Sequence, residues 1–354
     1  MKRLKELLNH FFIDGLSGMA LGLFSTLIVG TIIQQIGSFL PGAIGEYIYV
    51  IGKVAAAMTS AGIGVGVAYK FKESPLVTFS AATAGMVGGF AGKLLAGTVL
   101  VDGAMVFAGP GEPLGAFIAA VVGIEIGHLL SGKTKVDILV TPLATILSGS
   151  AVGLIVGPPI SSLMTQLGNL INWGTEQQPF LMGIIVSVLM GIILTLPISS
   201  AALGVILNLS GLAAGAAVIG CCCNMVGFAA ASYRENKIGG LIAQGVGTSM
   251  LQVPNLLRKP VLWLPAVISS AIVGPIGTVL LNMQCNATGS GMGSAGFVGQ
   301  IMTWQTMIAY DSAAVVLLKI LLLQFFLPAV LSLVISEYMR KKNWIRFGDL
   351  KLDL

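Results

Sequence analysis

Apolar stretches long enough to cross a bilayer recur along the whole chain. Eight of them are nearly continuous: 16–37, 46–69, 114–131, 137–157, 180–197, 211–232, 261–283 and 312–338. Three more are apolar but glycine-rich, short or interrupted by proline: 76–101, 198–208 and 238–257. A membrane-spanning helix needs about 20 mostly apolar residues, and only helices and closed barrels satisfy their own backbone in lipid. We therefore expect an all-α polytopic membrane protein with eight to ten crossings, the irregular stretches being full spans or re-entrant hairpins.

The distribution of charge supports a membrane location. Charged residues make up only 9% of the chain and hydrophobic residues 55%, whereas soluble domains carry about 25% charged residues. The basic residues lie at the ends of the apolar stretches and do not form one patch, which predicts a lipid bilayer as partner and no nucleic acid. Because both ends of the chain are basic, the positive-inside rule predicts that both termini of this multi-pass cell-membrane protein are cytoplasmic.

The domain organisation expected from this pattern is simple. Residues 1–15 form a basic amphipathic segment, 16–338 a single membrane domain, and 339–354 a cytoplasmic tail. Within the membrane domain we expect scaffold helices and a solute-binding core, with the core elements around 180–260.

Two prolines interrupt apolar stretches at places that also carry polar side chains. Residues 195–202 read TLPISSAA, so that Pro197 and two hydroxyls stand where a plain lipid-facing helix should continue. Pro254 interrupts a second stretch. Proline removes a backbone donor and clashes with the preceding turn. In membranes such breaks survive where they are buried in protein or line a wet cavity, and in transporters they mark solute sites. The breaks therefore favour a transporter.

Several longer strings resemble a known family. The strings are PLGAFIAAVVGIEIGHLLSGK, ILVTPLATILSGSAVGLIVGPPISSLMTQLGNLINW and, with its proline spacing, VPNLLRKPVLWLPAVISSAIVGPIGTVL. They resemble the integral membrane subunit (EIIC) of fructose-type sugar phosphotransferase systems over roughly residues 75–283. The ending WIRFGDLKL is similar to the EIIC-like branch named after the perfringolysin regulatory protein.

The resemblance implies a specific architecture. It implies a homodimer with a dimerisation scaffold and a core with two re-entrant hairpins, centred on Pro197 and Pro254. The second hairpin would lie opposite the first and form the other wall of the substrate cavity. The segment 284–311, polar and free of basic residues, would be an external loop or a pore-lining element.

The chain departs from the fructose-type pattern where chemistry is expected. Where that family has GGPVNKAA, an asparagine and a lysine are replaced by Ser199 and Ser200. Counting back from Pro254, the glutamate of the family's GITEG signature is Met250. A thioether neither takes up a proton nor accepts a strong hydrogen bond. We therefore predict no catalytic residues, no cofactor, and transport without sugar phosphorylation.

Polar groups beside the breaks are the candidates for solute contact. The candidate residues are Pro197, Ser199, Ser200, Asn208, Thr248, Ser249, Gln252, Asn255 and, on a separate glycine-rich segment, Lys93. Neutral donors and acceptors suit a small polar, sugar-like solute, whereas Lys93 suits an anion. The alternatives are that the serines bond carbonyls freed by Pro197, that the second group is a helix-packing network, and that Lys93 snorkels or pairs with Asp102.

Two further groups have alternative interpretations. Glu125 and His128 lie three residues apart on one helix face, where they could relay protons or bind an ion, although local pairing near the helix end is favoured. The consecutive Cys221–Cys223 could sense redox state or soft metals. Consecutive helical side chains diverge, so we predict packing residues and no metal site.

The sequence leaves three functions open. The favoured one is translocation of a small polar solute by an EIIC-like permease. The second is a membrane sensor that binds a metabolite and acts on gene expression through a partner. The third is an active phosphotransferase-system permease served by separate soluble subunits.

Overall fold

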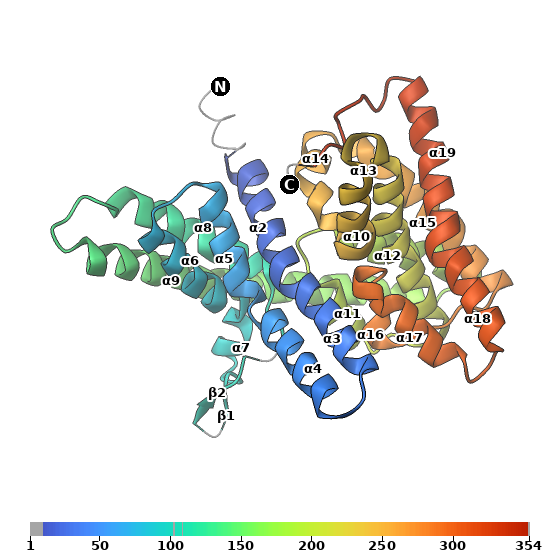
Figure 1. Cartoon of the computed structure of the whole chain (residues 1–354), viewed down its shortest axis with the longest axis horizontal. Coiled ribbons are helices and arrows are strands. Elements are labelled where there is room, and N and C mark those ends of the chain that lie inside the picture. Colours follow the sequence, from blue (N-terminus) through green and yellow to red (C-terminus); the bar gives the residue numbers. More distant parts are fainter. Residues whose placement is uncertain (1–9, 102, 108, 353–354) are drawn as a thin grey trace. The chain divides into compact units, whose positions relative to one another are not determined.

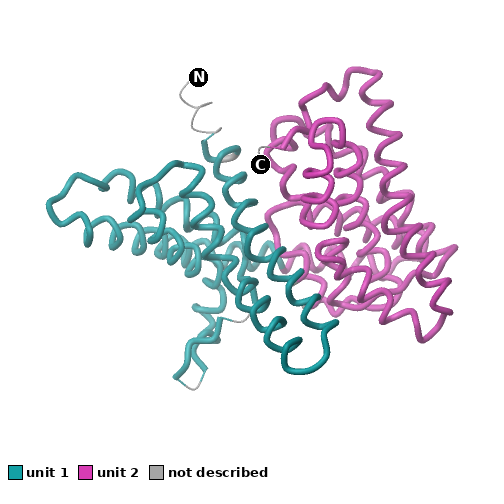
Figure 2. Tube along the Cα trace, in the orientation of Figure 1, with its two compact units in different colours: residues 1–164 teal, residues 165–354 magenta. Residues whose placement is uncertain are grey.

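The computed structural model describes residues 10–101, 103–107 and 109–352. Contacts between Cα atoms divide the chain into two compact units, residues 1–164 and 165–354 (Figure 2). In the described residues almost all regular structure is helical, and the exception is a small hairpin of β1 (Leu100–Val101) and β2 (Ala104–Met105). The all-α fold expected from the apolar stretches is therefore confirmed (Figure 1).

The first unit is built from helices that approach closely through small residues. Its helical elements are η1 (His10–Gly15), α2 (Leu16–Leu23), η2 (Phe24–Ile28), α3 (Val29–Phe39), α4 (Gly42–Ala57), α5 (Thr59–Lys70), α6 (Pro75–Gly89), α7 (Ala91–Leu95) and α8 (Pro113–Leu130). A side chain at Gly18 or Gly22 would overlap the backbone of α5. Glycine at these positions lets α2 and α5 pack backbone to backbone, as small residues do in membrane bundles.

Helix α9 (Asp137–Thr175) extends well beyond the apolar stretch 137–157 that the sequence predicts as a span. It is one helix of 39 residues that runs through Pro142, Pro158 and Pro159. The Gly-Pro-Pro sequence at 157–159 therefore does not end the helix. Each proline removes only one backbone donor, and membrane helices tolerate this where neighbouring groups or local adjustments compensate.

The second unit is arranged around α12. Its helical elements are α10 (Pro179–Thr195), α11 (Ser200–Ile206), α12 (Gly211–Ala231), α13 (Tyr233–Ile242), η3 (Ala243–Gly247), η4 (Ser249–Gln252), α14 (Val253–Arg258), η5 (Pro260–Trp263), α15 (Leu264–Pro275), η6 (Ile276–Leu280), α16 (Ala287–Ser290), η7 (Ala295–Phe297), α17 (Val298–Met307), α18 (Ala313–Ile320), η8 (Leu321–Phe326) and α19 (Leu327–Lys341). Helix α12 packs against α10, α15 and α19, which lie beside it in Figure 1. The expected core elements around 180–260 all belong to this unit.

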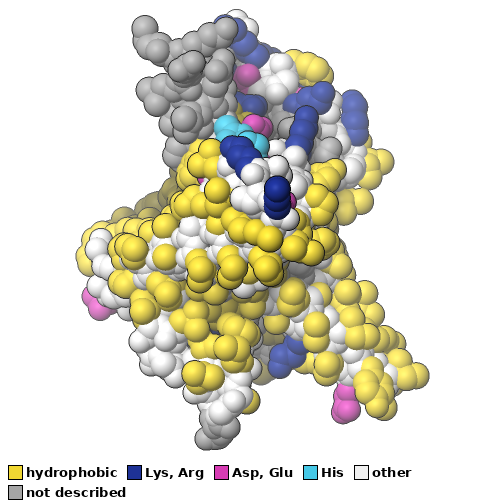
Figure 3. Space-filling view, turned by 90° about the vertical axis from the view of Figure 1, so that its left-hand side faces the viewer, with side chains coloured by type: hydrophobic (Ala, Val, Ile, Leu, Met, Phe, Trp, Pro, Cys, Tyr) yellow, Lys and Arg dark blue, Asp and Glu magenta, His cyan; other side chains and the backbone are white. Residues whose placement is uncertain are grey.

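Fewer helices than expected are long enough to cross a membrane. Among the described residues six helices qualify, or seven if the bent pair α4 and α5 counts as one span. The number is below the expected eight to ten crossings because α6 and α10, with 15 and 17 residues, are shorter than a full span. The face drawn in Figure 3 has broad hydrophobic areas.

At both ends of the chain, the described residues are joined to a helix of one of the two units. Of the expected amphipathic segment, residues 1–9 lie outside the described residues, and His10–Gly15 lead directly into α2. After α19 the chain turns at Asn343, which has a φ of 59°. Ile345, Leu350 and Leu352 of the tail are then buried against the second unit. The segment 284–311 is also packed, because Gly293 lies against Cys221 of α12.

Candidate functional site

The first break separates α10 from α11. Leu196 is extended, with φ −72° and ψ 158°, and α11 begins at Ser200. A residue before proline is pushed out of the helical region by the proline ring, so Pro197 ends α10 at Thr195. Thr195 is the last residue of α10, and its side chain is fully buried.

The second break has a more irregular backbone. The π-helical turn η3 ends at Gly247, and Thr248 is extended, with φ −159°. The Thr248 hydroxyl accepts a hydrogen bond of 3.1 Å from the Met250 N–H and starts the 3-10 turn η4. Pro254 then occupies the first turn of α14, where a backbone N–H would have no acceptor within the helix.

The two breaks meet through a hydrogen bond. The Thr195 and Ser249 hydroxyl oxygens are 2.8 Å apart, and both side chains are fully buried. Thr195 also approaches Asn224 Oδ1 of α12 at 3.2 Å. The Thr195 hydroxyl also lies 3.1 Å from the Gly191 carbonyl of its own helix. Its single hydrogen goes to that carbonyl or to Asn224, and in both cases Ser249 is the donor to Thr195. The ends of two interrupted helices are thus joined by a polar contact.

Asn224 is the centre of this arrangement. Its Oδ1 accepts from the Trp263 Nε1–H at 3.0 Å, and its Nδ2 donates to the Ser270 hydroxyl at 3.4 Å. We call Thr195, Asn224, Ser249, Trp263 and Ser270 the break cluster. Its members come from α10, α12, η4, η5 and α15, and every one is neutral. The cluster can exchange hydrogen bonds with a polar solute, but none of its own groups can serve as an acid or base near neutral pH.

Sequence reasoning found only part of this cluster. Ser249 is a candidate from the sequence, whereas Thr195, Asn224, Trp263 and Ser270 are not. Asn224 carries the signal that could have found them, since an amide inside an apolar run has to be partnered within the protein. It is fully buried, and its partners are the side chains that complete the cluster.

The candidates around the first break have other contacts. The Ser200 hydroxyl donates to the Gly291 carbonyl at 2.7 Å, and Ser199 and Pro197 are half-buried in the break itself. Asn208 is exposed and has a φ of 48°. It ends α11 in the left-handed conformation that asparagine tolerates at helix termini. Ser200 is thus bonded to the main chain of the segment 284–311 and not to a carbonyl of α10 freed by Pro197.

The candidates beyond the second break contact the C-terminal tail. Gln252 Nε2 donates to Gln244 Oε1 at 2.8 Å and to the Leu350 carbonyl at 3.0 Å. Asn255 Nδ2 donates to Gln252 Oε1 at 2.8 Å and to the Lys351 carbonyl at 2.9 Å. The structure therefore separates Gln252 and Asn255 from Ser249: they form a chain of amides that ends on the main chain of the tail.

The charged candidates belong to the first unit. Lys93 is exposed on α7, and its Nζ lies 5.5 Å from the centre of the Phe90 ring. Its possible partner Asp102 lies outside the described residues. Glu125 Oε1 is 3.1 Å from His10 Nε2, and His128 Nδ1 is 3.0 Å from Glu73 Oε1. Glu125 and His128 share a helix face as expected, but each has a partner on another element.

The cysteines are packed inside the second unit. Cys221, Cys222, Cys223 and Cys285 are all buried as free thiols. Cys221 Sγ lies 3.6 Å from the carbonyls of Met190 and Ser290, so it fills space between α12 and its neighbours. The contacts fit the interpretation of these residues as polarizable packing groups.

Comparison with known proteins identifies the family. The chain matches the family model described as "Phosphotransferase system, EIIC" over residues 13–352. A search of curated proteins finds no significant match. The match covers nearly the whole chain and extends well beyond the strings that suggested the resemblance. With its long apolar helices, the protein is a multi-pass membrane protein, and it belongs to the EIIC family of membrane permeases that handle sugars in the phosphotransferase system.

Proposed function

We propose that the break cluster is the solute site and that the protein translocates a small, neutral, sugar-like solute without phosphorylating it. The observation that carries the proposal is the buried contact between Thr195 and Ser249, which joins the two interrupted helices. Interrupted helices at mid-membrane are where transporters bind solutes. A site made from both breaks would be disassembled whenever the two helices separate.

The chemistry of the cluster favours an uncharged solute. Hydroxyl and amide groups of Thr195, Asn224 and Ser249 can exchange their mutual hydrogen bonds for bonds to sugar hydroxyls. A charged solute would need a buried opposite charge to offset its desolvation, and no member of the cluster supplies one. The indole of Trp263 adds an N–H donor and an apolar face against which a sugar ring can pack.

The residue at the expected catalytic position argues against phosphoryl transfer. Met250 is buried within η4, next to Ser249 of the cluster. Its thioether cannot take the proton that a sugar hydroxyl loses when it attacks a phosphoryl group. The proposed cycle is therefore binding, movement of the core and release, in a homodimer of the cell membrane with both termini in the cytoplasm.

Solute binding should depend on the hydroxyls of the cluster. In Thr195→Val and in Ser249→Ala, affinity for the transported sugar is expected to fall at least about tenfold, the loss of roughly 1.4 kcal/mol. Ser200→Ala and Gln252→Ala should have smaller effects, because these side chains lie outside the break cluster and bond the carbonyls of Gly291 and Leu350. The measurement is uptake of a panel of labelled sugars and polyols into proteoliposomes, with and without phosphoenolpyruvate and the soluble phosphotransferase proteins.

The control is Ser336→Ala, because Ser336 is buried outside the break cluster and its hydroxyl donates to the Leu333 carbonyl of its own helix. Unchanged uptake in Thr195→Val and Ser249→Ala would remove the cluster from the site. A phosphorylated product would refute transport without phosphorylation and support the active phosphotransferase permease.

A metabolite sensor is the second candidate function, and one contact favours it. The second break is bonded directly to the C-terminal tail through Gln252 and Asn255. A change at the solute site could therefore alter the tail, which a partner protein could read. Saturable sugar binding without flux in the same proteoliposomes would support the sensor over the permease.

A further inference from the structure

The C-terminal tail contacts the second break on both sides. The Leu350 carbonyl accepts from Asn236 Nδ2 of α13 at 2.8 Å and from Gln252 Nε2 of η4 at 3.0 Å. The main-chain N–H of Leu352 donates to Asn236 Oδ1 at 2.8 Å. One short stretch of the tail, folded in turns over residues 347–350, thus connects α13 to η4, across the π-helical turn η3 that separates them in sequence.

The same tail also holds the far end of the break. Asp349 Oδ2 lies 2.6 Å from Lys259 Nζ, directly after α14. Burial raises the pKa of Asp349, but the hydrogen bonds from Lys259 and from the Arg346 N–H, together with both positive charges, lower it overall. Asp349 is therefore ionised at neutral pH. The tail contacts at Asn236, Gln252 and Lys259 span the whole break.

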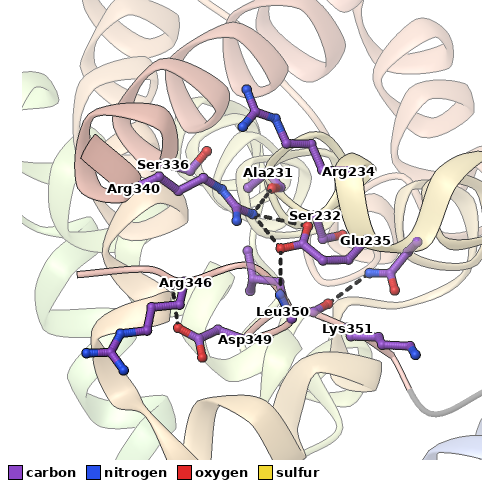
Figure 4. A network of polar contacts seen from close by, with 12 residues as sticks. Ala231, Ser232, Arg234, Glu235, Ser336, Arg340, Arg346, Asp349, Leu350 and Lys351 are labelled. Carbon is purple, nitrogen blue, oxygen red and sulfur yellow. Dashed lines mark hydrogen bonds and ion pairs between the residues drawn. The ribbon is translucent and has the colours of Figure 1, made fainter. Parts of the chain in front are cut away.

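Apolar side chains and a buried ion pair fix the tail in place. Ile345 and Leu350 pack in one cluster with Leu256 of α14 and Phe228 of α12. At the end of α19, Arg340 Nη2 is 2.9 Å from Glu235 Oε1, which also accepts from the Gly348 N–H at 3.4 Å. Figure 4 shows Arg340 and the tail on opposite sides of Glu235. The tail therefore links α19 to the break.

The contacts make the position of the break depend on the tail. If Asn236, Gln252 and Lys259 moved relative to one another, the tail could not keep its bonds to all of them. If the tail left, the buried amides of Gln252 and Asn255 would each lose an acceptor, which is costly for a buried donor. The break and the tail can change only together.

We propose that residues 343–352 form a strap that holds the second break in its present conformation. The break rearranges only when this strap leaves its position. The proposal concerns a conformational coupling and holds whether or not the break cluster binds a sugar. It assigns the polar residues Asn236, Gln252 and Asn255 to recognition of the strap's main chain. It assigns the pair of Lys259 and Asp349 to fastening the strap.

The test is thiol labelling of Leu256→Cys in the purified full-length protein. Leu256 is buried in the same apolar cluster as Ile345 and Leu350 of the strap, so the new thiol should react slowly while the strap is in place. Adding Asp349→Lys puts a positive charge against Lys259 and is expected to raise the labelling rate at least about tenfold, equivalent to roughly 1.4 kcal/mol. Adding Lys259→Asp to that variant restores an opposite-charge pair and should return the rate to its original value.

Two controls separate strap release from unfolding. The native cysteines are buried, three of them in α12 and Cys285 near its start, and should stay unlabelled throughout. Leu257→Cys, at an exposed position of α14, should react at the same rate with and without Asp349→Lys. The strap is refuted if the Leu256→Cys rate does not respond to Asp349→Lys. It is also refuted if the native cysteines become labelled in parallel, since the tail would then be part of the core and not a separate strap.

Discussion

Glu235→Ala is expected to destabilise the second unit by about 3–5 kcal/mol, the usual cost of leaving one partner of a buried ion pair unpaired. The Glu235 side chain is fully buried and the Arg340 side chain is 9% exposed, with Nη2 and Oε1 2.9 Å apart. Without the carboxylate, the partners left to Arg340 among the described residues are the Ala231 carbonyl, at 3.0 Å, and the more distant Glu337, at 3.8 Å. The measurement is the midpoint of thermal or denaturant unfolding in detergent.

A matched surface pair provides the control. Arg234 Nη2 lies 2.8 Å from Glu337 Oε2, but the Arg234 side chain is 62% exposed. Exposed pairs of this kind contribute about 0–1 kcal/mol, so Arg234→Ala should have little effect. The double variant Glu235→Leu with Arg340→Met should regain much of the lost stability, because a buried pair can be replaced by apolar residues of similar size. Equal effects of Glu235→Ala and Arg234→Ala would contradict a buried charge at Arg340.

The fold class follows from the sequence because only helices and closed barrels can span the hydrocarbon region of a bilayer. Long apolar runs with basic ends predict helices, and helices form wherever the backbone must satisfy itself. The prolines did not by themselves predict where a helix ends. Pro197 ends a helix, whereas Pro158 and Pro159 lie inside α9. A proline removes one donor in either case, and the surrounding packing decides whether the helix continues.

The candidate site was predictable only in part, for reasons that concern direction and partners. The two breaks could be located from their prolines, and Ser249 came from the second of them. Asn224 and Ser270 lie on helices that are apolar all round, so no amphipathic pattern shows which way their side chains point. The partners of Gln252 and Asn255 are main-chain carbonyls of the tail. Main-chain partners leave no signature in a sequence.

Gly220→Val is expected to prevent α12 from packing on α10 and to cost more than about 3 kcal/mol, above the usual range for an overpacked core. A side chain at Gly220 would overlap the backbone of Ser187 in α10, and one at Gly191 would overlap the Asn224 amide and approach the Gly220 carbonyl. Overlap with backbone atoms cannot be relieved by a rotamer change, so the helices must separate. The measurement is the unfolding midpoint, together with retention of a single species on size exclusion.

Gly239→Ala is the control, since a side chain there meets no atom within 4 Å and should leave the midpoint nearly unchanged. A midpoint for Gly220→Val as high as that of Gly239→Ala would show that α10 and α12 do not pack this closely.

The same crossing positions Asn224 against Thr195, so separating the helices also takes apart the break cluster. Gly220→Val should therefore lose stability and sugar binding together. Thr195→Val, which keeps the crossing and removes one hydroxyl, should lose binding while retaining most of its stability. That contrast distinguishes a residue that supports the site from one that contacts the solute.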